Sequence, residues 1–123
     1  MLIDEQTCSD GETFAEGVKR LGLATLVGKR TSGAGIWLSD GNMLLDGGRT
    51  RTAENGMFAQ DGSWLVEGRG VLPDVDVDYP PRATFKGGDA QLHETADLLK
   101  RKLVEQPVPK PLPPPRPRPA ATR

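Results

Sequence analysis

The stretch LIDEQTCSDGETFAEGVKRLGLATLVG, residues 2–28, decides the fold of this chain. It predicts a strand at 2–7, a helix at 10–21 ended by Gly22, and a strand at 24–28 that is buried on both faces. The inward stripe of the helix is predicted from the apolar side chains Phe14, Ala15, Val18 and Leu21. Strand, helix and strand in so short a length predict a βαβ unit with parallel pairing, and hence an α/β fold.

The rest of the body follows a different pattern. Between residues 36 and 66, short apolar runs are separated by SDGN, DGG and QDGS, the Asp-Gly chemistry typical of antiparallel hairpins. DVDVDY (74–79) alternates with period two and predicts a half-exposed strand. A second amphipathic helix is predicted from Asp89 to Val104. Its inward face is predicted from Leu92, Ala96, Leu99 and Leu103.

The C-terminal segment 107–123 differs in composition from residues 1–106, which are the predicted folded domain. It holds eight of the eleven prolines, and proline lacks the N–H donor that helices and sheets need. The segment is therefore predicted to be a disordered or polyproline II tail. Within it, the pattern from Pro111 to Arg116 is one that SH3-type domains bind.

Composition excludes several classes of protein. Hydrophobic residues are 36% and charged residues 27% of the chain, as in ordinary globular proteins, and no apolar run is long enough to span a bilayer. All acidic residues precede Gln106, so the body carries a net charge near −5, which argues against a nucleic-acid-binding surface. With no export signal in this sequence, a cytoplasmic location is expected.

Ser9 has two readings. Ser9-x-x-Glu12 before an apolar stripe fits a capping box, in which each of the two side chains accepts from the other residue's backbone N–H. The same turn would also hold a serine nucleophile beside the free N–H groups at the start of a helix. The local sequence is not the G-x-S-x-G elbow, so the pattern alone leaves both readings open.

The other candidates give weaker signals. Cys8 is the sole cysteine, so it forms no internal disulfide, and it is expected to be a small buried hydrophobic residue. His93 is the sole histidine and is expected to be exposed on its helix. The glycines of GKRTSGAG lack the Gly-Lys-Ser/Thr of a phosphate loop, and no spacing of ligand residues indicates a metal. No cofactor is expected.

Four stretches in order resemble the tail-specific (C-terminal-processing) serine proteases, and most closely their tricorn branch. They are DEQTCSDGETFAEGVKRLG (4–22), LVGKRTSG (26–33), VEGRGVLPDVDV (66–77) and GGDAQLHETADLL (87–99). The resemblance covers the C-terminal half of that family's catalytic domain. It implies part of a crotonase/ClpP-like ββα spiral core, with the N-terminal part of the domain missing.

Carried over by position, the resemblance implies three site residues. Ser9 would be the nucleophile, the backbone N–H of Asp10 would donate to the oxyanion, and Glu67 would help to orient the general base. In the bacterial branch a lysine is the base, but Ala34 occupies its place here, which excludes a Ser/Lys mechanism. In the tricorn branch the base is a histidine in a segment upstream of the nucleophile strand.

The leading hypothesis is therefore a serine endopeptidase that hydrolyses unfolded proteins or oligopeptides through an acyl-enzyme. This chain would be a fragment without its general base, inactive alone, whose partners are a peptide substrate and the missing N-terminal part of the same protease. Because the nucleophile strand is interior in that family, the isolated chain is expected to be marginally stable or oligomeric. The alternative is an inactive interaction module that uses the proline-rich tail as an SH3-type ligand.

Overall fold

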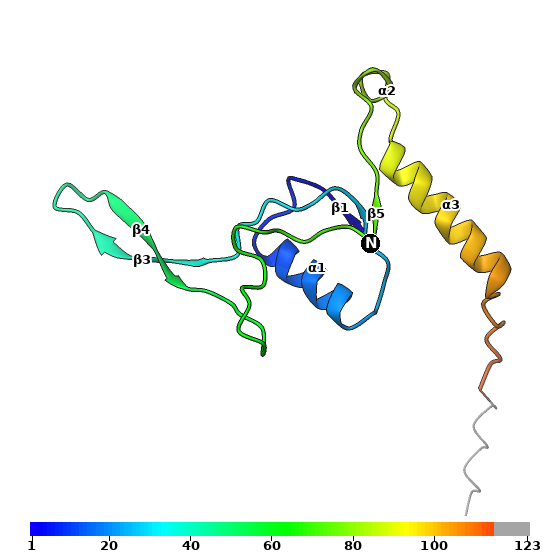
Figure 1. The fold of residues 1–123 in the computed structure, drawn as a ribbon, viewed down its shortest axis with the longest axis horizontal. Coiled ribbons are helices and arrows are strands. Elements are labelled where there is room, and N and C mark those ends of the chain that lie inside the picture. The colour runs from blue at the N-terminus through cyan, green and yellow to red at the C-terminus, as the bar shows by residue number, and fades with distance from the viewer. Residues whose placement is uncertain (115–123) are drawn as a thin grey trace, which may run out of the picture.

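The computed structural model describes residues 1–114, apart from the side chain of Asp40. Figure 1 shows a central body from which a two-stranded arm and a helical segment extend in different directions. The elements in chain order are β1 (Leu2–Ile3), α1 (Asp10–Arg20), β2 (Val27–Gly28), β3 (Trp37–Met43), β4 (Arg49–Asn55), β5 (Val75–Asp76), α2 (Pro81–Phe85) and α3 (Ala90–Glu105).

A three-stranded parallel sheet in the order β1-β2-β5 forms the centre of the body. Leu2 pairs with Val27, and Val27 pairs with Val75. Helix α1 makes the connection between β1 and β2, so the predicted βαβ unit with parallel strands is confirmed. The strands are shorter than predicted, since β1 ends at Ile3 and the chain then turns to present Ser9 at the start of α1. The buried core comprises Ile3, Ala15, Val18, Leu26, Val66 and Val71.

The face that α1 buries differs from the predicted apolar stripe. Ala15 and Val18 are buried as predicted, but Phe14 and Leu21 are 65% and 72% exposed. The third buried residue is Glu12, which lies three positions before Ala15 on the same face. The prediction for Phe14 and Leu21 was wrong because it assumed that the helix has its apolar residues inside and its carboxylates outside.

Helix α3 shows a related error. Leu92, Leu99 and Leu103, predicted to face inward, are all more than half exposed, and the buried residue is Gln91. Its side-chain Nε2 donates to the carbonyl of Val77 at 3.1 Å. A polar anchor at the beginning of the helix therefore fixes α3, and the leucine stripe stays uncovered in this structure.

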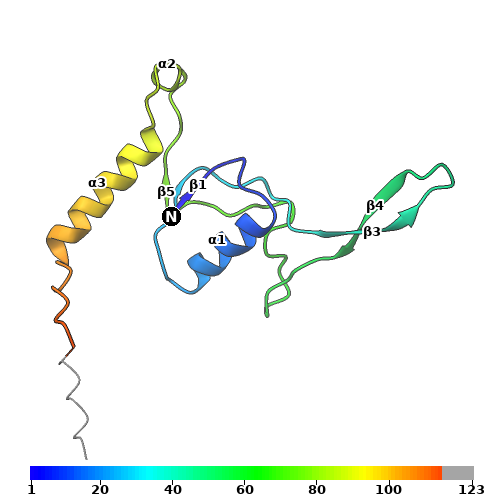
Figure 2. The ribbon, with the colours of Figure 1, turned by 180° about the vertical axis from the view of Figure 1, so that it is seen from behind.

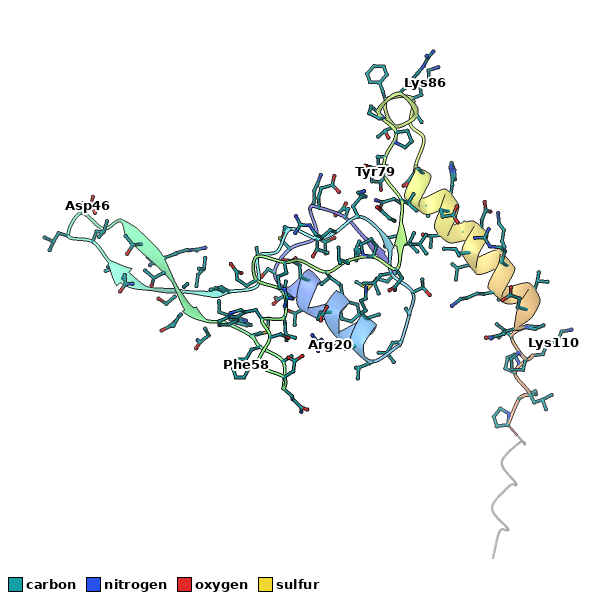
Figure 3. The ribbon with its side chains drawn as sticks, in the orientation of Figure 1. Arg20, Asp46, Phe58, Tyr79, Lys86 and Lys110 are labelled. Carbon is teal, nitrogen blue, oxygen red and sulfur yellow. The ribbon has the colours of Figure 1, made fainter. Side chains whose placement is uncertain are left out.

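The predicted hairpin is present as β3 and β4, which pair antiparallel with an irregular register. Figures 1 and 2 show that this arm projects away from the sheet and α1. Figure 3 places Asp46 at its tip, far from Arg20 and Phe58 on the body. Every residue of β4 is exposed, so the arm adds nothing to the core. A second turn is closed by an antiparallel bridge between Phe58 and Trp64.

The predicted strand at 74–79 forms as β5, with Val75 and Val77 half-buried and Asp76 and Asp78 exposed. Lys29 pairs with both aspartates at 2.9 and 3.7 Å. Residues 107–114 are exposed and carry no regular secondary structure, while the remainder of the tail, including Arg116 of the SH3-type pattern, lies outside the described residues. Among residues 1–114, no helix combines the length and apolarity needed to cross a bilayer.

Pairing of β1 with β2 depends on the absence of a side chain at Gly28. Its φ is +131°, and a Cβ there would lie 1.9 Å from the carbonyl oxygen of Ile3. We expect Gly28→Ala to lower the free energy of unfolding by about 3 kcal/mol or more. Urea unfolding followed by circular dichroism measures this.

Gly17→Ala is the matched control, because a Cβ at this position inside α1 would meet no atom within 4 Å. Alanine is a better helix former, so Gly17→Ala should raise the free energy of unfolding by about 0.5–1 kcal/mol. Equal effects of the two substitutions would contradict the parallel β1–β2 contact.

Candidate active site

Ser9 occupies a strained turn between β1 and α1. Its φ and ψ are 53° and −120°, and it is the only non-glycine residue with positive φ in the part of the chain that the structure describes. Such a conformation costs on the order of 1–3 kcal/mol and clusters at functional sites. A serine on a sharp strand-to-helix turn has an exposed hydroxyl, which is the geometry of a nucleophile elbow.

The capping-box arrangement predicted for Ser9 and Glu12 is present, although the Ser9 side chain makes no capping hydrogen bond. The Ser9 backbone N–H donates to Glu12 Oε2 at 3.1 Å. The Ser9 hydroxyl, by contrast, makes no capping hydrogen bond to the helix. Thr13 and Glu12 donate their backbone N–H groups to the Ser9 carbonyl instead, at 3.1 and 2.9 Å. The hydroxyl is therefore exposed and not engaged in capping α1.

The backbone N–H of Asp10 has the properties that an oxyanion donor needs. Within residues 1–114 it donates to no acceptor. It belongs to the first residue of α1, where the helix dipole is positive. Asp10 directly follows Ser9 in the chain, so the oxygen of a carbonyl group attacked by the Ser9 hydroxyl would lie near this N–H when it becomes negative. Its role in oxyanion binding stays a prediction.

Glu12 is the most connected residue of the site, and its side chain is fully buried. It accepts hydrogen bonds from five groups: the Thr31 hydroxyl, the Ser32 hydroxyl at 3.2 Å, Gly33 N at 2.7 Å, Ala34 N at 2.8 Å and Ser9 N at 3.1 Å. Burial raises the pKa of Glu12, but the hydrogen bonds from Thr31, Gly33, Ala34 and Ser32 together lower it further, so this pKa lies below its ordinary value of 4.5.

Glu67 holds the other end of the same loop. Its Oε2 accepts from the backbone N–H groups of Gly35 and Ile36 at 2.8 and 3.0 Å. Glu67 lies in a turn, and these two N–H groups are the partners of its carboxylate. Its Oε1 accepts no hydrogen bond from the described residues. Glu67 is thus anchored through one oxygen and has the other available.

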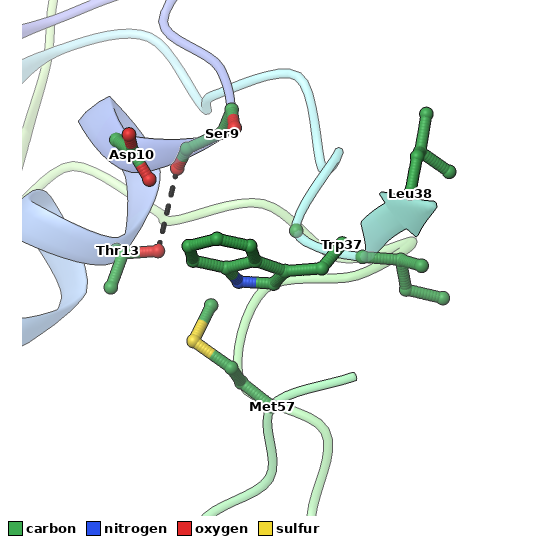
Figure 4. Close-up of a pocket in the computed structure, with 8 residues that line it drawn as sticks. Ser9, Asp10, Thr13, Trp37, Leu38 and Met57 are labelled. Atoms are coloured by element: carbon green, nitrogen blue, oxygen red, sulfur yellow. Dashed lines mark hydrogen bonds between the residues drawn. The ribbon is translucent and has the colours of Figure 1, made fainter. Parts of the chain in front are cut away.

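The loop held by Glu67 forms one wall of a hollow beside Ser9, with a volume of about 250 Å³. Figure 4 shows the Trp37 indole beside Thr13 and Met57, with Ser9 and Asp10 next to Thr13 at the start of α1. The lining residues are Ser9, Asp10, Thr13, Gly35, Ile36, Trp37, Leu38 and Met57. The hollow therefore combines an apolar surface with an exposed hydroxyl and a free N–H, a combination suited to one side chain of a peptide.

The remaining candidates lie outside this arrangement. Cys8 is exposed, so the expectation of a buried hydrophobic cysteine was wrong; the turn that carries Ser9 also turns Cys8 away from the core. His93 is exposed, as expected, in the first turn of α3, which Figure 1 shows well separated from the first turn of α1. Among residues 1–114, no three His, Cys, Asp or Glu side chains form a group that could hold a metal ion.

The profile of peptidase family S41 matches residues 1–77, which include Ser9, Glu12 and Glu67. The chain belongs to peptidase family S41. Two relatives of this S41 chain are the tricorn protease of Thermoplasma acidophilum, 33% identical over 102 residues, and tricorn protease homolog 1 of Streptomyces coelicolor, 33% identical over 106 residues. The alignments cover 83% and 86% of the chain but 10% of each relative, so the S41 chain spans about a tenth of their length.

Solved structures give the same relationship for this S41 chain. The crystal structure of the tricorn protease aligns with 84% of it at a TM-score of 0.77 and 32% identity, covering 10% of that protein. The photosystem II D1 C-terminal processing protease aligns with 63% of it at 0.53 and 27% identity, covering 19% of that protein. Mature CPAF complexed with lactacystin aligns with 85% of it at 0.70 and 24% identity, covering 20% of that protein, and shares the fold. The predicted family and α/β fold are confirmed.

Glu12 is the residue of this S41 site that the sequence prediction missed. The pattern Ser9-x-x-Glu12 predicted only its bond to the Ser9 N–H in a capping box, and nothing predicted its burial or its bonds to the loop 31–34. The signal that could have found it is the spacing Glu12, Ala15, Val18, which sets it on the buried face three residues before a small and then a β-branched residue.

The lowered pKa of Glu12 predicts a specific acid sensitivity. Because the folded-state pKa lies below the unfolded value, the ionised carboxylate stabilises the fold fully above about pH 4.5, and this contribution disappears as the pH falls through the folded-state pKa. The free energy of unfolding should therefore fall more steeply below about pH 4.5 in wild type than in Glu12→Gln. Denaturant titrations at a series of pH values measure both slopes, and equal slopes would contradict the role assigned to this carboxylate.

Proposed function

We propose that this chain carries the nucleophile, one oxyanion donor and the orienting carboxylate of a tricorn-like serine endopeptidase. Ser9 is the nucleophile, the Asp10 N–H stabilises the oxyanion, and Glu67 orients the general base. The observation that carries the proposal is the strained, exposed Ser9 at the start of α1, next to an N–H without an acceptor in the described chain. A serine used as a plain helix cap has no need of positive φ.

The reaction follows from these positions. The Ser9 Oγ attacks the carbonyl carbon of a peptide, the base takes the hydroxyl proton, and the Asp10 N–H donates to the oxygen that becomes negative. The C–N bond then breaks, and the base returns the proton to the leaving amine, which leaves an acyl-enzyme on Ser9. Water, deprotonated by the same base, attacks the ester and releases the acid and free Ser9.

The general base comes from a segment of the protease other than the residues described. Ala34 offers no amine to Ser9, and His93 lies on α3 away from the site. The free Oε1 of Glu67 is the acceptor that would orient an incoming imidazole, because Oε2 is already fixed by Gly35 and Ile36.

The substrate is an unfolded protein or an oligopeptide. The hollow beside Ser9 is open and lined on one side by Trp37, Leu38 and Met57, which suits an apolar side chain of an extended peptide. The chain is about a tenth of its tricorn relatives, and it exposes large apolar side chains such as Leu23, Leu99 and Leu103. These surfaces fit a fragment that packs against the rest of a cytoplasmic, oligomeric protease.

Imidazole added to the solution should replace the missing base and make Ser9 reactive. With a fluorophosphonate probe, a bond forms between Ser9 Oγ and phosphorus, fluoride leaves, and the hydroxyl proton passes to imidazole. We expect labelling of the 123-residue chain to be negligible without imidazole, to rise with imidazole concentration, and to map to Ser9 by mass spectrometry of peptides.

Two serine variants control this experiment. Ser9→Ala should abolish the labelling, whereas Ser63→Ala, in a turn stabilised by Asp61, should leave it unchanged. Strong labelling of Ser9 without imidazole would show that the chain needs no external base. Absence of labelling at every imidazole concentration in the folded chain would contradict Ser9 as the nucleophile.

A further inference from the structure

We propose that Glu12 is a positioning residue of this peptidase site: its buried carboxylate fixes the Ser9 turn and the loop 31–36 in one arrangement and thereby sets the position of Glu67. The inference rests on the function proposed above and extends it to a residue that does not touch the substrate. Glu12 would act through Ser9 on one side and through the loop on the other.

Four consecutive backbone N–H groups of one loop connect Glu12 to Glu67. Gly33 and Ala34 donate to Glu12 at 2.7 and 2.8 Å, and the next two, Gly35 and Ile36, donate to Glu67 at 2.8 and 3.0 Å. Two carboxylates from distant parts of the chain thus hold adjacent halves of one short loop. Because each peptide unit is planar and the four units are joined through φ and ψ alone, a change of these angles at Gly33 or Ala34 redirects the N–H groups of Gly35 and Ile36. The position of Glu67 is therefore coupled to that of Glu12.

Glu12 is also bonded to the nucleophile turn. Its Oε2 accepts from Ser9 N as well as from Ala34 N, so one oxygen atom lies between the serine and the loop. The Ser9–Asp10 peptide group carries the proposed oxyanion donor, and its orientation follows the Ser9 φ and ψ that this bond helps to hold. Strained backbone persists only where several contacts fix it. Glu12 supplies the contact at the amide end of Ser9.

A neutral amide cannot replace the carboxylate. Both oxygens of Glu12 accept, Oε1 from two donors and Oε2 from three. Glutamine has one acceptor oxygen and an NH2 that donates, so in Glu12→Gln at least two of the five donors would face another donor. The loop and the Ser9 turn would then move apart while the apolar core stays unchanged.

The experiment compares Glu12→Gln with Glu16→Gln in the 123-residue chain, using imidazole-assisted fluorophosphonate labelling. Glu16 lies one turn further along α1, and its side chain, 16% exposed, pairs with Arg20, so it is matched in residue type and helix. Rates measured against probe concentration give kinact and KI separately, and each is corrected for the folded fraction. We expect kinact to fall about 100-fold in Glu12→Gln with little change in KI, because misplacement by about 1 Å has that effect on the chemical step. Glu16→Gln should match wild type.

Amide NMR spectra provide an independent readout. In Glu12→Gln, the N–H resonances of Gly35 and Ile36 should shift although neither group bonds to residue 12, and the Asp10 N–H should shift with them. In Glu16→Gln these resonances should stay in place. If Glu12→Gln does not fold, Ser32→Ala removes a hydroxyl that is shared between Glu12 Oε2 at 3.2 Å and the Thr7 carbonyl at 3.1 Å, and should lower kinact by about threefold.

The outcomes separate this inference from the proposed function. Suppose that imidazole makes the wild-type chain reactive and that kinact is unchanged in the folded Glu12→Gln chain. This result would overturn the positioning role of Glu12 and leave Ser9 as the nucleophile. If Glu12→Gln is unfolded, an unchanged kinact in Ser32→Ala has the same meaning. A wild-type chain that imidazole cannot make reactive would overturn the peptidase function. If the wild-type chain is not labelled, the amide spectra still test the link between Glu12 and Glu67. Resonances of Gly35 and Ile36 that do not shift in Glu12→Gln would overturn that link as well, and resonances that shift would show that it exists as a structural contact.

Discussion

The arrangement of this site depends on one buried carboxylate. A carboxylate without water is unstable by several kcal/mol unless donors replace its hydration, and Glu12 has five. The Thr31 hydroxyl, which donates to Glu12, also accepts from Val71 N at 2.7 Å. This chain of hydrogen bonds runs from the Ser9 turn through the loop to a core residue. The interaction that satisfies the buried charge therefore also connects the Ser9 turn to the hydrophobic core.

The same interaction explains how Ser9 keeps an unfavourable backbone conformation. The positive φ costs on the order of 1–3 kcal/mol, and bonds on both sides of the residue offset it. Glu12 holds the Ser9 N–H, while the N–H groups of Glu12 and Thr13 hold the Ser9 carbonyl. The hydroxyl takes no part in these bonds. The fold thus uses the backbone of Ser9 for structure and leaves its hydroxyl free of these bonds, which is why a capping pattern and the proposed nucleophile can share one sequence.

The sequence predicted the elements whose formation depends on residues close together in the chain. The βαβ unit follows from short apolar runs around a helix, and the arm follows from Asp-Gly turns, so both were predicted. The exposure of Leu99 and Leu103 and the burial of Glu12 depend instead on which parts of the protein pack against each helix. The periodicity of the sequence carries no information about these neighbours. Of the site, Ser9, Asp10 and Glu67 came from the family resemblance. Glu12 was missed because hydropathy ranks a glutamate as exposed whatever donors surround it.

Glu12 and Glu67 hold the same loop but differ in what remains of their bonding capacity. Both oxygens of Glu12 are occupied by protein donors, so this carboxylate cannot bind another group without losing one. Glu67 gives one oxygen to Gly35 and Ile36, and its second oxygen has no donor among the described residues. An anchored carboxylate with one open oxygen can orient an imidazole with little loss of entropy, because its own rotamer is already fixed. The two carboxylates therefore differ: Glu12 has no oxygen left for another group, whereas Glu67 has the open oxygen that the proposed mechanism needs.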